Sequence, residues 1–393
     1  MRLWLLLALA VFAPLCAAEP LFESELLFPL EEWHNHSSSV VVTPDGGLFA
    51  VWFQGSGERK ADDVKVMGAR LAAGSKRWSE PFVVADQPGF PDTNCTLFVD
   101  KRGRLFLFWM TFIANLQQTT VVQYRVSSDW TDEGVPQWDR QDLLLLHHDQ
   151  EAFHRTVKDH NDPLMARASG ERKAYLQRVT DDAEDKYKSR MGWMVRTHPV
   201  QLPSGRILVG LYSDIFDFGV VAISDDEGAT WRPSLPMVGG GGVQPSIVRK
   251  KDGTLVAWMR DNGEAPKRVL RSESNDDGET WSANEDFDAI PNPGASVEAI
   301  VLSTGEWLMV NNDTERGRHS LAVFLSRDEG STWPVMRHLE LEAPSAGSFS
   351  YPSVIEAKDG TIHVTYSVHL PGPRKAIKHA RFNREWVLDA SGE

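Results

Sequence analysis

The string SDDEGATW, residues 224–231, recurs as SNDDGETW at residues 274–281 and as SRDEGSTW at residues 326–333. The copies share the pattern Ser-x-Asp-x-Gly-x-Thr-Trp and lie between apolar runs. Asp favours turns, Gly permits a positive φ, and Trp supplies a large apolar side chain. Repeats with a period of roughly fifty residues are typical of propellers, solenoids and arrays. The string therefore predicts a repeated folding device rather than a catalytic motif.

A second repeat consists of an apolar strand, a turn that contains Gly, and another apolar strand. The six turn glycines are Gly46, Gly103, Gly205, Gly253, Gly305 and Gly360. The flanking runs are rich in Val, Ile, Leu and aromatic residues, as in β-hairpins. In several units a third apolar run follows, so that each unit would form a four-stranded blade. We predict an all-β fold, a six-bladed β-propeller with Asp-box repeats, in which residues 21–30 add a strand that closes the ring.

Residues 1–18 have the features of a secretory signal peptide: a basic start, an apolar run and small residues at the end. Cleavage near Glu19 predicts a secreted or periplasmic protein, and a lipid anchor on Cys16 is the alternative. No other apolar run is long enough to span a membrane. Because the mature chain would keep only Cys95, an internal disulfide is excluded.

The propeller is expected to form a single domain over residues 19–393, with an insertion at about residues 147–192. This polar segment interrupts the repeat and predicts a helical or loop excursion. The net charge of −14 argues against nucleic acid and anionic membranes as partners, although a local Arg cluster is still able to bind an acidic ligand. We expect a monomer without a cofactor. No Cys or paired-His spacing indicates a metal site.

The phase of the repeat brings polar residues to one end of the predicted inner strands. Antiparallel strands reverse direction, so the start of one strand and the end of the next share a face of the disk. The residues at these positions are His36, Asn94, Arg196, His198, Tyr212, Asp214, Gln244, Arg260, Asp261, Ser296, Asn312, Asp313 and Tyr351. So many polar groups at strand ends predict a pocket on the propeller axis.

The repeated string resembles the Asp box of the sialidase (neuraminidase) superfamily, and the similarity to secreted BNR-repeat proteins of this type extends over nearly the whole mature chain. The resemblance implies a Tyr nucleophile and a triad of Arg residues that binds a substrate carboxylate. Tyr351, at the start of the last inner strand, stands at the position of the nucleophile. Arg318, just ahead of the last Asp box, stands at one position of the triad.

Three other positions differ from the pattern of the family. The sequence His36-Ser37-Ser38 replaces the expected Phe-Arg-Ile-Pro motif, and Asn312 replaces a second triad Arg. Ser296 replaces the Glu that polarises the nucleophile, with Glu298 two residues further along. Residues two apart in a strand share a face, so Glu298 is the candidate base for Tyr351.

Tyr has an ordinary pKa of about 10 and needs a base or a positive field to act as a nucleophile. Arg260 and Arg196 are candidates for the missing Arg positions, since the planar guanidinium binds carboxylates bidentately. His198, Gln244, Asn312 and Asp313 are further candidates for substrate binding. The general acid is expected among Glu58 and Asp62, in the polar loop after the first hairpin, and His36.

These residues favour a glycosidase that removes terminal acidic sugars, with acidic glycans as its partners. One alternative is a lyase or hydrolase for uronic-acid polysaccharide, in which His36 or His198 and Tyr351 act as base and acid. Another is a glycan-binding propeller without catalysis, since one fold serves many functions.

Overall fold

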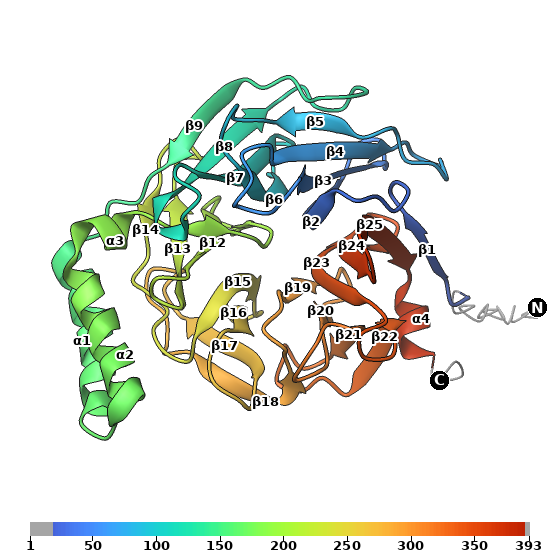
Figure 1. Ribbon diagram of the computed structural model, residues 1–393. Coiled ribbons are helices and arrows are strands. Elements are labelled where there is room, and N and C mark those ends of the chain that lie inside the picture. Colours follow the sequence, from blue (N-terminus) through green and yellow to red (C-terminus); the bar gives the residue numbers. More distant parts are fainter. Residues whose placement is uncertain (1–18, 390–393) are drawn as a thin grey trace, which may run out of the picture.

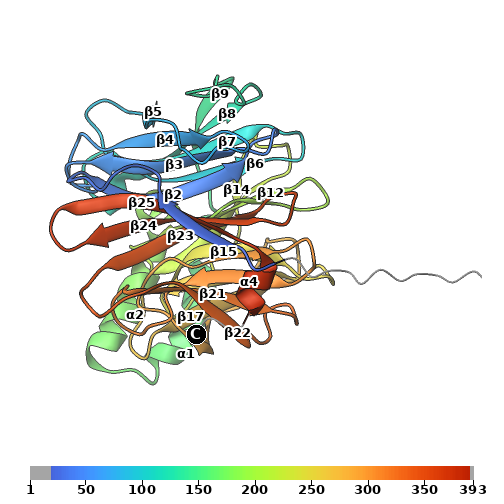
Figure 2. The same cartoon turned by 90° about the vertical axis from the view of Figure 1, so that its right-hand side faces the viewer.

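The computed structural model describes residues 19–389 and forms a ring of six antiparallel sheets around a central axis (Figure 1). The predicted all-β class and the six-bladed propeller are confirmed. Figure 2 shows the same disk from its edge. The predicted signal peptide, residues 1–18, lies outside the described residues.

The first three blades follow one another along the chain. Blade 1 contains β2 His34–Val42, β3 Leu48–Gly55, β4 Lys65–Leu71 and β5 Phe82–Ala85. Blade 2 contains β6 Asp92–Val99, β7 Leu105–Phe112, β8 Thr120–Ser127 and β9 Arg140–Leu144, with the short 3-10 helix η1 Gln117–Thr119 between β7 and β8. In blade 3 the inner strand is broken into β10 Met194–Val195 and β11 Val200–Gln201, which both pair with β12 Ile207–Ser213; β13 Phe218–Ser224 and β14 Arg232–Pro233 follow.

The last three blades complete the ring. Blade 4 contains β15 Gly242–Arg249, β16 Leu255–Asp261, β17 Arg268–Ser274 and β18 Glu285–Pro291. Blade 5 contains β19 Glu298–Val301, β20 Trp307–Asn311, β21 Ser320–Ser326 and β22 Val335–Leu341. Blade 6 contains β23 Ser348–Glu356, β24 Ile362–Leu370, β25 Arg374–Phe382 and, from the start of the chain, β1 Phe22–Leu26. Because β1 pairs with β25, the predicted closing strand is confirmed.

The Asp boxes connect the third and fourth strands of blades 3, 4 and 5, and they form the same hydrogen bonds each time. In blade 5, Asp328 accepts from the backbone N–H and the hydroxyl of Thr332, at 2.8 and 2.7 Å, and from the hydroxyl of Ser326. Gly330 has a φ of +82° and lies against Trp258 and Trp307, where a Cβ would come within 2.8 Å of either ring. The predicted turn device is therefore confirmed.

The core lies between blades. Within residues 19–389 the buried apolar residues form six clusters, each shared by two neighbouring blades. Trp333 of an Asp box packs edge-on against Trp258 of the preceding blade at 5.6 Å between ring centroids. Each buried aromatic of this kind contributes about 1.5–3 kcal/mol. The Asp boxes thus hold adjacent blades in a fixed arrangement around the axis.

The predicted insertion between blades 2 and 3 contains three helices, α1 Gln150–Met165, α2 Gly170–Glu184 and α3 Lys186–Arg190. They project from the rim of the disk (Figure 1). Phe153 and Val157 of α1 and Val179 of α2 are buried in the cluster between blades 2 and 3. A final short helix, α4 Arg384–Leu388, follows β25. In the part of the chain that the structure describes, no helix is long and apolar enough to cross a membrane.

Candidate active site

Four inner strands share a β-bulge at the same place. The register shifts lie between His36 and Ser39, Thr93 and Thr96, Val243 and Ser246, and Ser350 and Ser353. Each bulge contains one residue with positive φ, namely Ser37 at 56°, Asn94 at 35°, Gln244 at 59° and Tyr351 at 59°. A bulge inserts an extra residue and redirects side chains, and bulges are common beside active sites.

A cavity of about 250 Å³ lies where the inner strands converge. All six blades or the loops of those blades contribute to its wall. Of the twelve residues proposed from the sequence for catalysis or substrate binding, five lie in that wall: His36, Glu58, Arg260, Arg318 and Tyr351. The wall does not include the other seven, which are Asp62, Arg196, His198, Gln244, Glu298, Asn312 and Asp313. Three more residues that the phase of the repeat placed at the axis also line the cavity: Asn94, Tyr212 and Asp214.

Tyr351 is the centre of the site. Its side chain is 8% exposed, and its hydroxyl accepts hydrogen bonds from Arg260 Nη1 at 3.0 Å and from Gln244 Nε2 at 3.4 Å. Burial by itself raises the pKa of Tyr351, but the charges of Arg260 and Arg318 and the bond from Gln244 outweigh it, so the pKa lies below its ordinary value. The site therefore favours the phenolate, the more nucleophilic form.

Two further arginines flank the ring of Tyr351. The guanidinium carbons of Arg318 and Arg196 lie 5.4 and 5.2 Å from the ring centroid. Arg318 faces the cavity and donates to the carbonyl of Gly294 at 2.9 Å. Arg196 is 1% exposed and donates to the carbonyls of Pro352 and Ser38 at 2.7 and 3.3 Å. Arg196 thus supports Tyr351 from outside the cavity wall, whereas Arg260 and Arg318 are open to a ligand.

His36 packs directly on the nucleophile candidate. The ring centroids of His36 and Tyr351 are 4.2 Å apart, and His36 Nδ1 lies 2.8 Å from the hydroxyl of Ser367. Burial, with the nearby charges of His369, His34, Arg318 and Arg196, lowers the pKa of His36 well below its ordinary value. The imidazole is therefore neutral near pH 7.

Glu298 is buried and joins three blades. One carboxylate oxygen accepts from the backbone N–H of His198 at 2.7 Å and lies 3.0 Å from His198 Nδ1, and the other accepts from the N–H of Val354 at 2.8 Å. Burial raises the pKa of Glu298, but His198 and Arg196 outweigh this effect and the pKa is lowered. In the described residues none of its hydrogen bonds goes to Tyr351. Glu298 instead holds the strand three residues beyond Tyr351, so any effect on the nucleophile passes through that strand.

The remaining candidates belong to the support of the site. Asn312 is buried and donates to the carbonyls of Phe349, at 2.8 Å, and Ser320. Asp313 accepts from the hydroxyl of Ser320 and lies 2.9 Å from His338 Nε2. Asp62 accepts from Asn115 at 2.8 Å, which fixes the loop that carries Glu58. These contacts bind the side chains of Asn312, Asp313 and Asp62 to neighbouring protein groups.

The model of the BNR repeat-like domain family matches residues 46–157 and 179–364. The chain belongs to the BNR repeat-like family. The resemblance to the sialidase superfamily is therefore confirmed. Residues 158–178, which lie between the matched ranges, fall in α1 and α2 and the turn between them.

Individual proteins are similar to this chain in part of the sequence or in the fold. A sialidase from Micromonospora viridifaciens is 29% identical over 182 residues, which make up 43% of this chain and 26% of that protein. This chain thus spans about a quarter of the length of the curated relative that it matches. The intramolecular trans-sialidase from Ruminococcus gnavus, in complex with oseltamivir carboxylate, has a TM-score of 0.67 at 15% identity, with 90% of this chain and 95% of that chain covered. A protein of unknown function from Dyadobacter fermentans has a TM-score of 0.68 at 16% identity, with 92% and 98% covered.

The structure of this BNR protein adds residues to the site that were not selected from the sequence. Arg59, Gln117 and Asn262 line the cavity, from loops whose positions no repeat phase specifies. Asp214, which the phase did place at the axis, accepts a hydrogen bond from Gln117. Burial raises the pKa of Asp214, against the opposing charge of Arg260. Asp214 is thus a carboxyl group in the cavity wall that is suited to hold a proton.

No group of three or more His, Cys, Asp or Glu side chains is placed to bind a metal ion anywhere in residues 19–389. The chemistry of the cavity is that of two phenols, three guanidinium groups, a neutral imidazole and carboxyl groups.

Proposed function

We propose that this protein is an exported glycoside hydrolase that releases a terminal acidic sugar, of the sialic acid type, from glycans with retention of configuration. The observation that carries the proposal is the position of Tyr351, whose hydroxyl lies in the cavity wall 3.0 Å from Arg260 and whose pKa is lowered. The membership in the BNR family and the sialidases among the relatives support it. The sequence of residues 1–18 supports export.

The reaction follows from the residues of the cavity. The phenolate oxygen of Tyr351, stabilised by Arg260 and Arg318, attacks the anomeric carbon and forms a glycosyl-tyrosine bond as the glycosidic C–O bond breaks. A carboxyl group of the wall, Glu58 or Asp214, gives its proton to the leaving oxygen. Water, deprotonated by the same carboxylate, then cleaves the glycosyl-tyrosine bond. Sialidases are the known exception that uses Tyr in place of a carboxylate nucleophile.

Arg260 and Arg318 give the site its preference for an acid. A carboxylate beside the anomeric carbon accepts charge-assisted hydrogen bonds from these guanidinium groups, which burial strengthens. Arg318 is held by the carbonyl of Gly294, so its side chain is fixed before a ligand binds. Neutral sugars would leave both charges without a counter-ion and would bind more weakly.

The test is the release of the fluorophore from a 4-methylumbelliferyl sialoside. We expect turnover by the parent protein and a loss of roughly 10³-fold or more in kcat in Tyr351→Phe, because the variant lacks the nucleophile. Tyr366→Phe is the matched control, since its hydroxyl bonds to Glu340 outside the cavity. A parent protein that does not turn over the sialoside, or a Tyr351→Phe variant that keeps full activity, would refute the proposal.

One observation favours a second function, a lyase for uronic-acid polysaccharide. The neutral imidazole of His36 lies against Tyr351, and a base and an acid at this spacing are what β-elimination requires. The product of a lyase absorbs in the ultraviolet through its new C=C bond. An ultraviolet signal that the parent protein produces from a uronide substrate, and that His36→Ala does not produce, would favour the lyase. If the parent protein produces no such signal, the hydrolase is the better assignment. A protein that binds glycans but forms neither product would be a binding propeller.

A further inference from the structure

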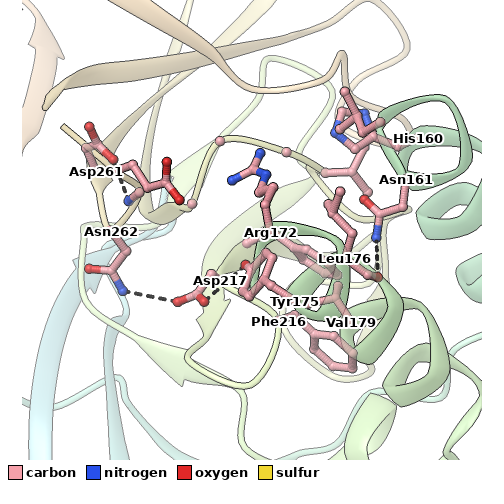
Figure 3. A pocket seen from close by; sticks show the side chains of 18 of the residues that line it. His160, Asn161, Arg172, Tyr175, Leu176, Val179, Phe216, Asp217, Asp261 and Asn262 are labelled. Atoms are coloured by element: carbon pink, nitrogen blue, oxygen red, sulfur yellow. Dashed lines mark hydrogen bonds between the residues drawn. The ribbon is translucent and has the colours of Figure 1, made fainter. Parts of the chain in front are cut away.

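A second cavity, the helical cavity, lies beside the active site and is larger than it. Its volume is about 610 Å³, within the range of about 300–1,000 Å³ that is usual for ligand sites. One side consists of α1 and α2, and the other of the β12–β13 turn, the loop before β15 and the loop after β16 (Figure 3). The family model does not match residues 158–178, so part of this wall is specific to the inserted helices.

The two cavities are adjacent and share one lining residue. Asn262 lines both, and its side-chain amide lies 3.4 Å from Asp217 Oδ1. Asp217 Oδ2 in turn accepts from the hydroxyl of Tyr175 on α2 at 3.2 Å. In Figure 3 Asp217 lies between Asn262 and Tyr175. Asp214, on the same β12–β13 turn, lines the active-site cavity. A glycan held in the active site therefore has the helical cavity as its neighbour on this side.

The charges of the two cavities have opposite signs. The active site contains three cationic side chains and two acidic ones; they are Arg59, Arg260 and Arg318, and Glu58 and Asp214. In the helical cavity, five carboxyl groups stand against one guanidinium, that of Arg172; they are Glu171, Asp217, Asp261, Glu264 and Asp286. Burial lowers the pKa of His160, so this imidazole is neutral near pH 7. The helical cavity therefore repels anions, whereas the active site attracts them.

The side chains that line the helical cavity suit a ligand rich in hydroxyl groups. Carboxylates accept hydrogen bonds from hydroxyls, and Arg172 and Asn262 donate to them. Figure 3 shows the guanidinium of Arg172 extending from α2 into the cavity. Gly239, Gly240 and Gly241 form part of the opposite wall with φ values of 92°, 67° and 75°. The three glycines themselves add no side chain to this wall, and the imidazole of His160 lies against Gly239.

We propose that the helical cavity is a subsite for the neutral sugar units to which the acidic sugar is attached. This inference rests on the proposed function and extends it. The substrate is then a glycan with one terminal acidic sugar over a neutral chain, and a polymer that carries an acid on every unit is excluded by the carboxylates beside the site.

The experiment compares two substrates of the full-length protein. The 4-methylumbelliferyl sialoside lacks a sugar on the leaving side, whereas a sialylated neutral tetrasaccharide extends into the helical cavity. We expect Arg172→Ala and Tyr175→Phe to lower kcat/KM about tenfold on the oligosaccharide, the scale of one or two hydrogen bonds, and to keep kcat/KM on the sialoside within twofold. Arg167→Ala is the matched control, because Arg167 is an exposed Arg of the same insertion that does not line the cavity. Equal losses on both substrates, or no loss on either, would overturn the inference.

A binding measurement separates this inference from the proposed function. Lacto-N-neotetraose, a neutral tetrasaccharide, is titrated into the parent protein and the variants and followed by calorimetry. We expect saturable binding that Arg172→Ala weakens about tenfold and Tyr351→Phe does not alter. If the parent hydrolyses neither substrate but shows this binding, the proposed function fails and the neutral subsite stands. Absence of binding, or tighter binding of a chondroitin tetrasaccharide, which carries several acids, would overturn the subsite.

Discussion

Two sets of residues in this propeller adopt left-handed backbone conformations, and they solve different problems. In the Asp boxes the pairs Glu227–Gly228, Asp277–Gly278 and Glu329–Gly330 have positive φ. In the bulges of the inner strands Ser37, Asn94, Gln244 and Tyr351 have positive φ. The second residue of every Asp-box pair is Gly, whereas no bulge residue is.

The difference lies in whether the side chain is needed. The Asp-box glycines lie at the turn, where a close neighbour such as Trp258 leaves no room for a Cβ. The bulge residues are all buried, at 0–8% exposure, and three of them take part in the hydrogen bonds of the site. A left-handed residue with a Cβ costs about 1–2 kcal/mol. The first residue of each Asp-box pair has the same cost, so it is the burial and the hydrogen bonds of the bulge residues that indicate that the bulges serve the cavity.

The largest effect is expected where a charge acts on a bulge residue. Arg260→Gln removes the positive charge 3.0 Å from the hydroxyl of Tyr351. The charge of Arg260 favours the phenolate and so lowers the pKa of Tyr351. Its loss should therefore raise that pKa. We expect kcat/KM to fall about 10–100-fold, because a hydrogen bond from a charged group is lost. The measurement is the pH titration of phenolate absorbance, with Tyr351→Phe subtracted to isolate this residue.

The matched control for that prediction is Arg316→Gln. Arg316 is exposed, on the same loop as Arg318, and outside the cavity wall. Its replacement should leave both the titration and kcat/KM unchanged. A Tyr351 titration that stays in place in Arg260→Gln would contradict the electrostatic account of the nucleophile.

An Asp box should show the opposite behaviour, a loss of stability without a loss of activity. Asp328→Ala removes three hydrogen bonds of the turn in blade 5. We expect the free energy of unfolding in urea to fall by about 1–2 kcal/mol and kcat/KM at a temperature well below unfolding to stay the same. Ser331→Ala, at the exposed variable position of the same box, is the control. A large fall in activity at full stability would make the Asp box part of the site.

The sequence was sufficient for the architecture because the propeller repeats. Six turn glycines and three Asp boxes specify the hairpins and their order, and the strand ends that carry His36, Arg260 and Tyr351 do meet at one cavity. Such a prediction needs only local turn chemistry and the reversal of antiparallel strands.

The direction of the side chains was less predictable from the sequence. Successive side chains of a strand point to opposite faces, and a bulge reverses this alternation for the residues that follow it. Arg196 and His198 lie where blade 3 breaks its inner strand into β10 and β11, and neither lines the cavity. Glu298 begins β19, whereas Ser296 precedes this strand, and the carboxylate of Glu298 bonds to His198 and Val354. The sequence contains no signal for the helical cavity, which depends on contacts between α2 and loops of blades 3 and 4.

The smallest effect is a gain in stability at a bulge whose side chain the cavity does not use. Ser37 has a φ of 56°, is fully buried and lies outside the cavity wall, and its hydroxyl has no hydrogen-bond partner in residues 19–389. Ser37→Gly releases the left-handed strain and removes that hydroxyl, while Gly adds freedom to the unfolded chain. We expect the free energy of unfolding to rise by about 1 kcal/mol and kcat/KM to stay the same.

Ser37→Ala separates the two contributions. Alanine removes the buried hydroxyl but keeps a Cβ at a positive φ, so any advantage of Gly over Ala is the backbone strain less the extra freedom of Gly in the unfolded chain. Denaturation by urea of the parent and both variants gives the comparison, with Gly expected to be the more stable of the two. If Ala is equal to Gly or better, the strain does not exceed the extra freedom of Gly in the unfolded chain, and the absence of glycine from the bulges would no longer distinguish them from the Asp boxes.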